Sequence, residues 1–207
     1  SIPRHDASSW RSPTPSPTPV RSPCHAAPCS RRSRRRSSRP CAGKCFNAGQ
    51  TCIAPDYALV RDDKIDAFVE AFRARVAAFY PTLADNADYT SIVNERHYKR
   101  VVGLIDEARQ RGARIVEANP AGEQLDPAQR KIAPTLVIGA PDDCAVMQDE
   151  IFGPVMPVVP YRRLEDAIAY VNDRPRSLAL YYFDRDGERV RKVLSETTSG
   201  GACVNDT

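Results

Sequence analysis

A cysteine at the end of a glycine-containing segment is the residue of this chain best suited to covalent chemistry. Cys52 ends the segment Phe46-Asn47-Ala48-Gly49-Gln50-Thr51-Cys52. A loop cysteine can present its sulfur to a cleft, where backbone N–H groups favour a thiolate and hold an oxyanion. A thiolate adds to an aldehyde to give a thiohemiacetal, from which a hydride can leave to a nicotinamide. The residues alone leave a second interpretation open, since a lone cysteine is more often a small buried apolar side chain.

An acidic residue beside a phenylalanine is the second candidate site. Glu150 belongs to the segment Met147-Gln148-Asp149-Glu150-Ile151-Phe152-Gly153-Pro154-Val155. The sequence predicts a short helical turn before Glu150 and a strand after Pro154. A carboxylate at such a junction can accept hydrogen bonds from the hydroxyls of a ribose, and Phe152 can pack against a flat ring. The commoner fate of such a pair is a surface glutamate beside a core phenylalanine.

No metal site is predicted from the cysteine and histidine spacing. The five candidate ligands do not form two matched pairs of closely spaced ligands, as a zinc knuckle requires; they are Cys24, His25, Cys29, Cys41 and Cys45. The chain has seven cysteines. Their odd number and scattered positions indicate a reducing compartment rather than a disulfide framework, and we expect a cytoplasmic protein.

Strands alternate with amphipathic helices through most of the chain. Apolar residues recur on one helical face over 65–79, with Asp62 or Asp63 as the expected cap, and a second helix is predicted from Asn94 to a stop at Gly112. Further helices are expected over 164–171 and 188–195, and strands over 55–60, 113–117, 135–138, 155–159, 178–183 and 201–204. This alternation predicts an α/β fold, with a mostly parallel sheet and flanking helices.

Residues 1–42 differ in composition from the rest and predict a disordered tail before a single domain, residues 43–207. This segment holds ten Ser and eight Pro. Residues 1–40 have nine Arg against one acid, whereas the remainder has 21 Lys and Arg against 25 Asp and Glu. So little apolar surface cannot offset the entropy of ordering. As an alternative, an Arg-rich tail could bind nucleic acid or act as a targeting peptide.

Neither a membrane helix nor a signal peptide is predicted. The chain has no apolar run near the roughly 20 residues that span a bilayer. The segment 1–40 lacks leucine and any apolar core.

The two segments resemble the aldehyde dehydrogenase superfamily, and Ile53-Ala54-Pro55-Asp56-Tyr57 is similar to its class 3 and coniferyl aldehyde branch. The resemblance covers residues 43–207 and extends to Ile132–Leu136, Asn172–Pro175 and Ser199–Asp206. It implies that Cys52 is the nucleophile, with its own backbone N–H in the oxyanion hole, and that Glu150 and Phe152 contact the nicotinamide ribose of NAD or NADP. The implied reaction oxidises an aldehyde, such as coniferyl or another aromatic or medium-chain aldehyde, to a carboxylic acid.

The resemblance also implies parts that these 207 residues lack. In the family the nucleotide domain, a general-base glutamate and an oxyanion-hole asparagine precede the cysteine, and a strand used in homodimer formation follows. Since general-base catalysis is typically worth about 10²–10⁴-fold, we expect the chain alone to be inactive. We hypothesise that residues 1–42 are an out-of-frame translation joined near Gly43. A non-catalytic remnant with the family fold is the remaining alternative.

Overall fold

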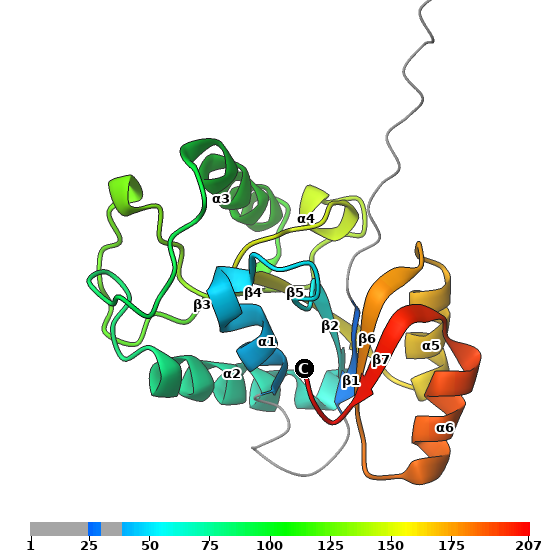
Figure 1. Cartoon of the computed structure of the whole chain (residues 1–207). Coiled ribbons are helices and arrows are strands. Elements are labelled where there is room, and N and C mark those ends of the chain that lie inside the picture. Colours follow the sequence, from blue (N-terminus) through cyan, green and yellow to red (C-terminus); the bar gives the residue numbers. More distant parts are fainter. Residues whose placement is uncertain (1–24, 30–38) are drawn as a thin grey trace, which may run out of the picture.

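The computed structural model describes residues 25–29 and 39–207, and within them seven strands form one sheet (Figure 1). The strand order is β3-β4-β5-β2-β1-β6-β7. The strands are β1 (His25–Cys29), β2 (Tyr57–Arg61), β3 (Arg114–Glu117), β4 (Thr135–Ile138), β5 (Val155–Tyr161), β6 (Ser177–Phe183) and β7 (Ser199–Val204). All neighbouring pairs are parallel except β3 with β4. The prediction of a mostly parallel α/β sheet is confirmed.

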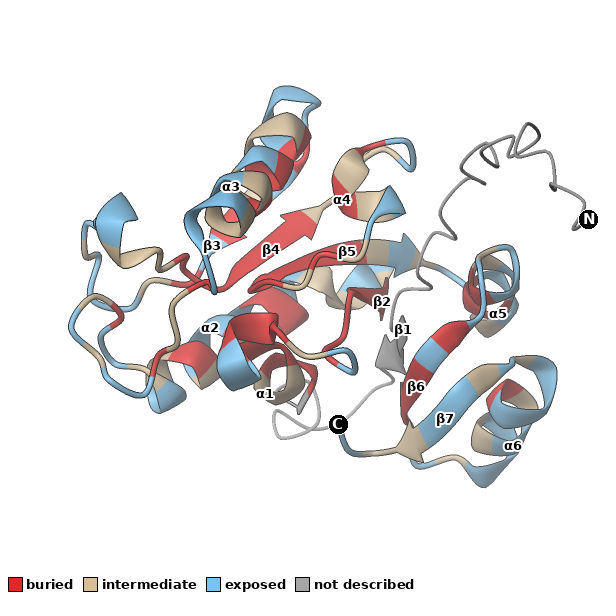
Figure 2. Cartoon of the chain, turned by 45° about the horizontal axis from the view of Figure 1, so that its top comes forward, coloured by how far each residue is buried: buried red, intermediate tan, exposed pale blue. Residues whose placement is uncertain are grey.

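Helices cover both faces of the sheet. They are α1 (Arg39–Cys45), α2 (Ile65–Phe79), α3 (Glu95–Gln110), α4 (Ala145–Gln148), α5 (Leu164–Asn172) and α6 (Gly187–Glu196). Ala58 and Val60 of β2 pack with α1 and α2, while Leu59 between them packs with α5. This alternation follows from side chains pointing to opposite faces of a strand. Helices α3 and α4 pack on the same face as α5 and α6, with the buried strands between the layers (Figure 2).

Helix α3 begins and ends where the sequence predicts. The Asn94 side chain accepts a hydrogen bond from the His97 amide at 2.9 Å, which caps the first turn. Gly112, at φ +88°, follows the last turn. The cap expected for α2 is wrong, because Asp62 and Asp63 lie in a 3₁₀ turn and the Asp63 carboxylate pairs with Arg61 instead.

One described strand and the start of a helix lie in the segment 1–42, for which the sequence predicts disorder. Helix α1 begins at Arg39, four residues before the expected boundary at Gly43, and β1 lies between β2 and β6. The register of β1 shifts between Ala26 and Cys29. Pro28 lies in this interval and has no N–H to donate to a neighbouring strand. The rest of the expected tail, with its Arg-rich run, lies outside the described residues.

None of the helices within the described residues is long and apolar enough to cross a membrane.

Candidate active site

Cys52 lies in an exposed turn between the 3₁₀ helix η1 (Phe46–Gly49) and β2. We call residues 47–56 the thiol loop. Its first three residues have a left-handed backbone, with φ of 49° at Asn47, 52° at Ala48 and 72° at Gly49. The Asn47 amide group donates to the Gln50 carbonyl at 3.2 Å, a local bond that helps asparagine adopt this conformation. The thiol therefore follows a sharp, hydrogen-bonded reversal of the chain.

The Gln50 carboxamide anchors one side of the thiol loop. Its nitrogen donates to the carbonyls of Asn47 at 3.2 Å and Ser91 at 3.1 Å, and its oxygen accepts from the Val93 amide at 2.8 Å. Gln50 is buried. Buried hydrogen bonds of this kind are costly to break, since each leaves a desolvated backbone group. Gln50 thus fixes the loop against residues 91–93.

Tyr181 anchors the other side of the thiol loop. Its hydroxyl, at the middle of β6, donates to the carbonyl of Ile53 at 2.7 Å. Ile53 directly follows Cys52. Strand β6 is buried in the sheet, so this bond ties the thiol to a rigid element.

Gly49 brings the thiol loop against the second predicted segment. A Cβ built on Gly49 would lie 2.3 Å from the carbonyl oxygen of Gly153. Real side chains never approach so closely, so only glycine allows this contact. We call residues 150–153 the acidic loop, and Gly153 is its last residue. The structure therefore places the two segments that the sequence singles out against each other.

A buried ion pair forms a second link between these segments. Lys44 Nζ, in the last turn of α1, lies 3.7 Å from Asp56 Oδ1, and both side chains are buried. Asp56 Oδ1 also accepts a hydrogen bond from the Ile151 amide at 3.3 Å. Burial raises the pKa of the Asp56 carboxyl, while the positive charge of Lys44 opposes that rise. The pair thus connects the end of the thiol loop to the acidic loop.

Two side chains of α3 hold the carbonyls of the acidic loop. The Arg100 guanidinium donates to the carbonyls of Glu150, at 2.9 Å, and Ile151. His97 Nε2 lies 2.7 Å from the carbonyl oxygen of Phe152. The rings of His97 and Phe152 meet edge to face, with centroids 6.2 Å apart. Phe152 has φ +51°, which a non-glycine residue rarely adopts.

A cavity of about 640 Å³ opens beside this loop. It is lined by Val93, Asn94, Arg96, His97, Arg100 and Phe152. Of the three predicted site residues, only Phe152 lines it; Glu150 is half-buried and Cys52 exposed, each outside the lining. Within the part of the chain that the structure describes, the Glu150 carboxylate takes part in no hydrogen bond or ion pair, so it is available to a ligand.

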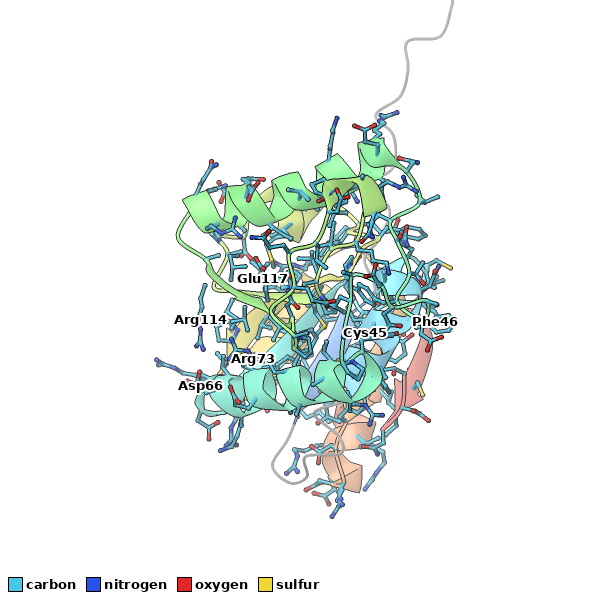
Figure 3. The ribbon with its side chains drawn as sticks, turned by 90° about the vertical axis from the view of Figure 1, so that its left-hand side faces the viewer. Cys45, Phe46, Asp66, Arg73, Arg114 and Glu117 are labelled. Atoms are coloured by element: carbon cyan, nitrogen blue, oxygen red, sulfur yellow. The ribbon has the colours of Figure 1, made fainter. Side chains whose placement is uncertain are left out.

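A second cavity, of about 510 Å³, lies on another side of the molecule. It is lined by Glu70, Arg73, Ala74, Ala77, Glu117, Ala118, Asn119 and Pro120. Figure 3 looks onto this side, where Asp66 and Arg73 come from α2 and Arg114 and Glu117 from β3. The Arg114–Asp66 ion pair, at 2.9 Å, is surface-exposed. This cavity has no nucleophile in its lining and is separate from both predicted segments.

The other described thiols are less suited to nucleophilic attack than Cys52. Cys41 and Cys45 are buried with their sulfurs 3.6 Å apart. Their mutual hydrogen bond, and then burial, raise the pKa of Cys41 far above its ordinary value. Desolvation likewise raises the pKa of the buried Cys144. Cys203 on β7 is half-buried. No group of three or more His, Cys, Asp or Glu side chains suited to a metal ion occurs among the described residues.

Sequence reasoning missed the residues that hold the two loops. In the sequence, His97 stands among charged neighbours on a predicted helix, a pattern typical of a solvated side chain. Gln50 lies in the segment that ends at Cys52 and Asp56 follows it, yet their partners are backbone groups far along the chain. The one available signal was the i, i+3 spacing of His97 and Arg100, which places them on one helix face.

The chain matches the family model described as "Aldehyde dehydrogenase family" over residues 35–207. It is 52% identical over 165 residues to a "probable coniferyl aldehyde dehydrogenase" of Pseudomonas aeruginosa, covering 80% of this chain and 34% of that protein. It is 42% identical over 165 residues to the rat "aldehyde dehydrogenase, dimeric NADP-preferring", covering 79% and 34%. The chain therefore spans about a third of the length of these relatives.

The fold is similar to that of solved structures as well. The chain superposes on the substrate-bound state of Staphylococcus aureus AldH with a TM-score of 0.80 and 36% sequence identity. The match covers 91% of this chain and 40% of that one.

Proposed function

The chain belongs to the aldehyde dehydrogenase family, and on that basis we propose that it carries the thiol half of a site that oxidises aldehydes to carboxylic acids with NAD or NADP. The observation that carries this proposal is the glycine contact between the thiol loop and the acidic loop. It keeps a nucleophile and a free carboxylate in adjoining segments. A nucleophile for the aldehyde and a group for the cofactor must lie close together if hydride is to pass between them.

Cys52 is the nucleophile in this proposal. Its thiolate adds to the carbonyl carbon of the aldehyde, and the carbonyl π electrons move to oxygen, which gives the oxyanion of a thiohemiacetal. The exposed position of Cys52 admits the substrate, while Gln50 and Tyr181 fix the loop that carries it. Water finally cleaves the thioester formed at the sulfur, releasing the carboxylic acid and restoring the thiol.

Glu150 and Phe152 are the proposed cofactor contacts. The Glu150 carboxylate can accept hydrogen bonds from the two ribose hydroxyls, and the Phe152 ring borders the cavity where a flat ring can pack. Loss of a hydride from the thiohemiacetal carbon leaves a thioester at the sulfur. Bound NAD⁺ or NADP⁺ would supply the acceptor for that hydride.

We propose an aromatic aldehyde of the coniferyl type as the substrate of the whole protein. Support comes from the names of relatives that are 52% and 47% identical to the chain. The dimeric state named for the rat relative supports a dimer here as well. We still predict that these 207 residues alone give no turnover. The measurement is NAD(P)H formation from coniferyl aldehyde, which should not be detectable.

Acylation tests the role of Cys52 in the chain as it stands. In the 4-nitrophenyl ester of a cinnamic acid, attack by the Cys52 thiolate forms a thioester and expels 4-nitrophenolate. We expect one equivalent of fast release and one acyl group at Cys52 by peptide mass spectrometry. Cys52→Ser should abolish this burst, and Cys203→Ser, the matched control, should retain it. Equal acylation of Cys52 and Cys203, at the rate at which a small thiol in solution reacts with the ester, would refute the assignment of Cys52 as the nucleophile.

A further inference from the structure

We infer that His97 and Arg100 are positioning residues that hold the acidic loop in the shape that presents Glu150 and Phe152. This inference rests on the proposed function, since it concerns the proposed cofactor contacts. Neither side chain has to touch the cofactor for the role. Both act through the backbone of the loop.

Three consecutive carbonyl groups of the loop are bonded to one face of α3. Arg100 donates to the carbonyls of Glu150 and Ile151, and His97 Nε2 bonds to that of Phe152 at 2.7 Å. Hydrogen bonds from a charged guanidinium are stronger than those between neutral groups. On its other side the Ile151 amide donates to Asp56. The peptide group between Glu150 and Ile151 is therefore restrained from two directions.

The two hydrogen-bond partners of His97 favour one tautomer of its ring. A carbonyl oxygen only accepts, so Nε2 must carry the proton in its bond to Phe152. Arg100 Nε donates to the other ring nitrogen, Nδ1, at 3.5 Å, which requires a lone pair there. The tautomer with hydrogen on Nε2 satisfies both contacts. His97 links the guanidinium of Arg100 to the carbonyl of Phe152.

The conformation of the loop requires this restraint. Phe152 has φ +51°, and such a conformation persists in a non-glycine residue only when its surroundings enforce it. Gly153 follows it, where a Cβ would lie 3.0 Å from a Val101 methyl group. Without His97 and Arg100 we expect the backbone at Phe152 to relax and its ring to leave the cavity wall.

The position of the two side chains distinguishes this role from general stabilisation. His97 and Arg100 line the same cavity as Phe152. Lys99, on the same helix, pairs with Glu95 on the surface and forms no hydrogen bond or ion pair with the loop among the described residues. Lys99 therefore provides a control of equal charge at a neighbouring position.

The test compares His97→Leu, His97→Gln, Arg100→Met and Lys99→Met in the full chain, first without ligand. Hydrogen exchange of the Ile151 amide should accelerate about tenfold or more in His97→Leu and Arg100→Met, the effect of losing one to two hydrogen bonds. His97→Gln should stay near the unaltered rate, because its amide can donate where Nε2 does. Lys99→Met should leave the exchange rate of the Ile151 amide unchanged. Nitrogen NMR of the imidazole should show the Nε2–H tautomer.

The second readout is binding of nicotinamide mononucleotide, followed by saturation-transfer NMR. We expect weaker binding in His97→Leu and Arg100→Met, with recovery in His97→Gln. Unchanged exchange and unchanged binding in His97→Leu and Arg100→Met would overturn the inference and leave the proposed function intact. Faster exchange in a chain that never binds the nucleotide would instead support the positioning role while refuting the proposed cofactor contacts.

Discussion

The α-carbon of Gly49 faces the carbonyl oxygen of Gly153 so closely that a methyl group on Gly49 would lie 2.3 Å from it. Gly49→Ala should therefore weaken folding by two effects. A left-handed alanine costs roughly 1–2 kcal/mol, and overpacking a dense region typically costs about 1–3 kcal/mol more. Urea denaturation measures the change. Gly103→Ala is the control, since its Cβ meets nothing within 4 Å on helix α3 and should add about 0.5–1 kcal/mol of stability. Equal effects of both changes would contradict the contact.

Gln50→Ala removes three hydrogen bonds at once and leaves the Val93 amide and the Ser91 carbonyl without their partner. Each buried group left unsatisfied costs about 1–3 kcal/mol. We expect lower stability and slower acylation of Cys52, because the thiol loop loses its anchor. Gln110→Ala, at an exposed position, should change neither quantity. Loss of stability with unchanged acylation would show that Gln50 does not position the thiol.

Tyr181→Phe deletes only the hydroxyl that donates to the Ile53 carbonyl. The expected loss of stability is about 1 kcal/mol, typical of one hydrogen bond. The larger effect should appear in the acylation burst, since Ile53 adjoins Cys52. Tyr98→Phe serves as the control, because the Tyr98 hydroxyl has no hydrogen-bond partner among the described residues. An acylation burst at the unaltered rate in Tyr181→Phe would show that Tyr181 does not position the thiol.

Lys44→Met should destabilise the chain in a pH-dependent way. Burial raises the pKa of the folded Asp56 carboxyl above its ordinary value of 3.8, so the folded state binds the proton more tightly than the unfolded state. The contribution of Asp56 to the free energy of unfolding therefore falls as the pH rises from 3.8 toward the pKa of the folded state. Removing Lys44 takes away the positive charge that lowers this pKa. The pKa of the folded Asp56 carboxyl then rises further, and the fall in stability extends to higher pH.

The loss in Lys44→Met should thus be greater at pH 8 than at pH 5. Breaking a buried ion pair typically costs about 3–5 kcal/mol when the remaining charge stays ionised. Urea denaturation at the two pH values measures the difference, with Lys99→Met as a surface control. An equal loss at both pH values would mean that the charge of Asp56 is not involved.

The sequence predicted most elements of the fold because their signals are local. Asn94 and Gly112 bound α3 as predicted, and β4 coincides with the apolar run that predicted it. The short strand β1 was not predicted, because His25–Cys29 contains Pro28 and has no apolar alternation. Its place depends on β2 and β6, which no local pattern reveals.

The sequence predicts the two segments that carry the candidate site, but not the side chains that hold them in place. Cys52, Glu150 and Phe152 follow from the sequence as candidates. Their support does not, because Gln50, His97 and Arg100 bond to backbone carbonyls and amides, which every residue has. Long-range pairings of this kind leave no periodicity to detect.

The anchors of the thiol loop also fix when it can form during protein synthesis. Gln50 bonds to a residue 43 positions later, Asp56 to one 95 later, and Ile53 to one 128 later. A ribosome adds about 5–20 residues per second, so Cys52 emerges several seconds before the last of its anchors. During that interval the nascent chain holds its thiol on an unformed loop. The reactive cysteine is thus made well before the loop that carries it can take its final shape.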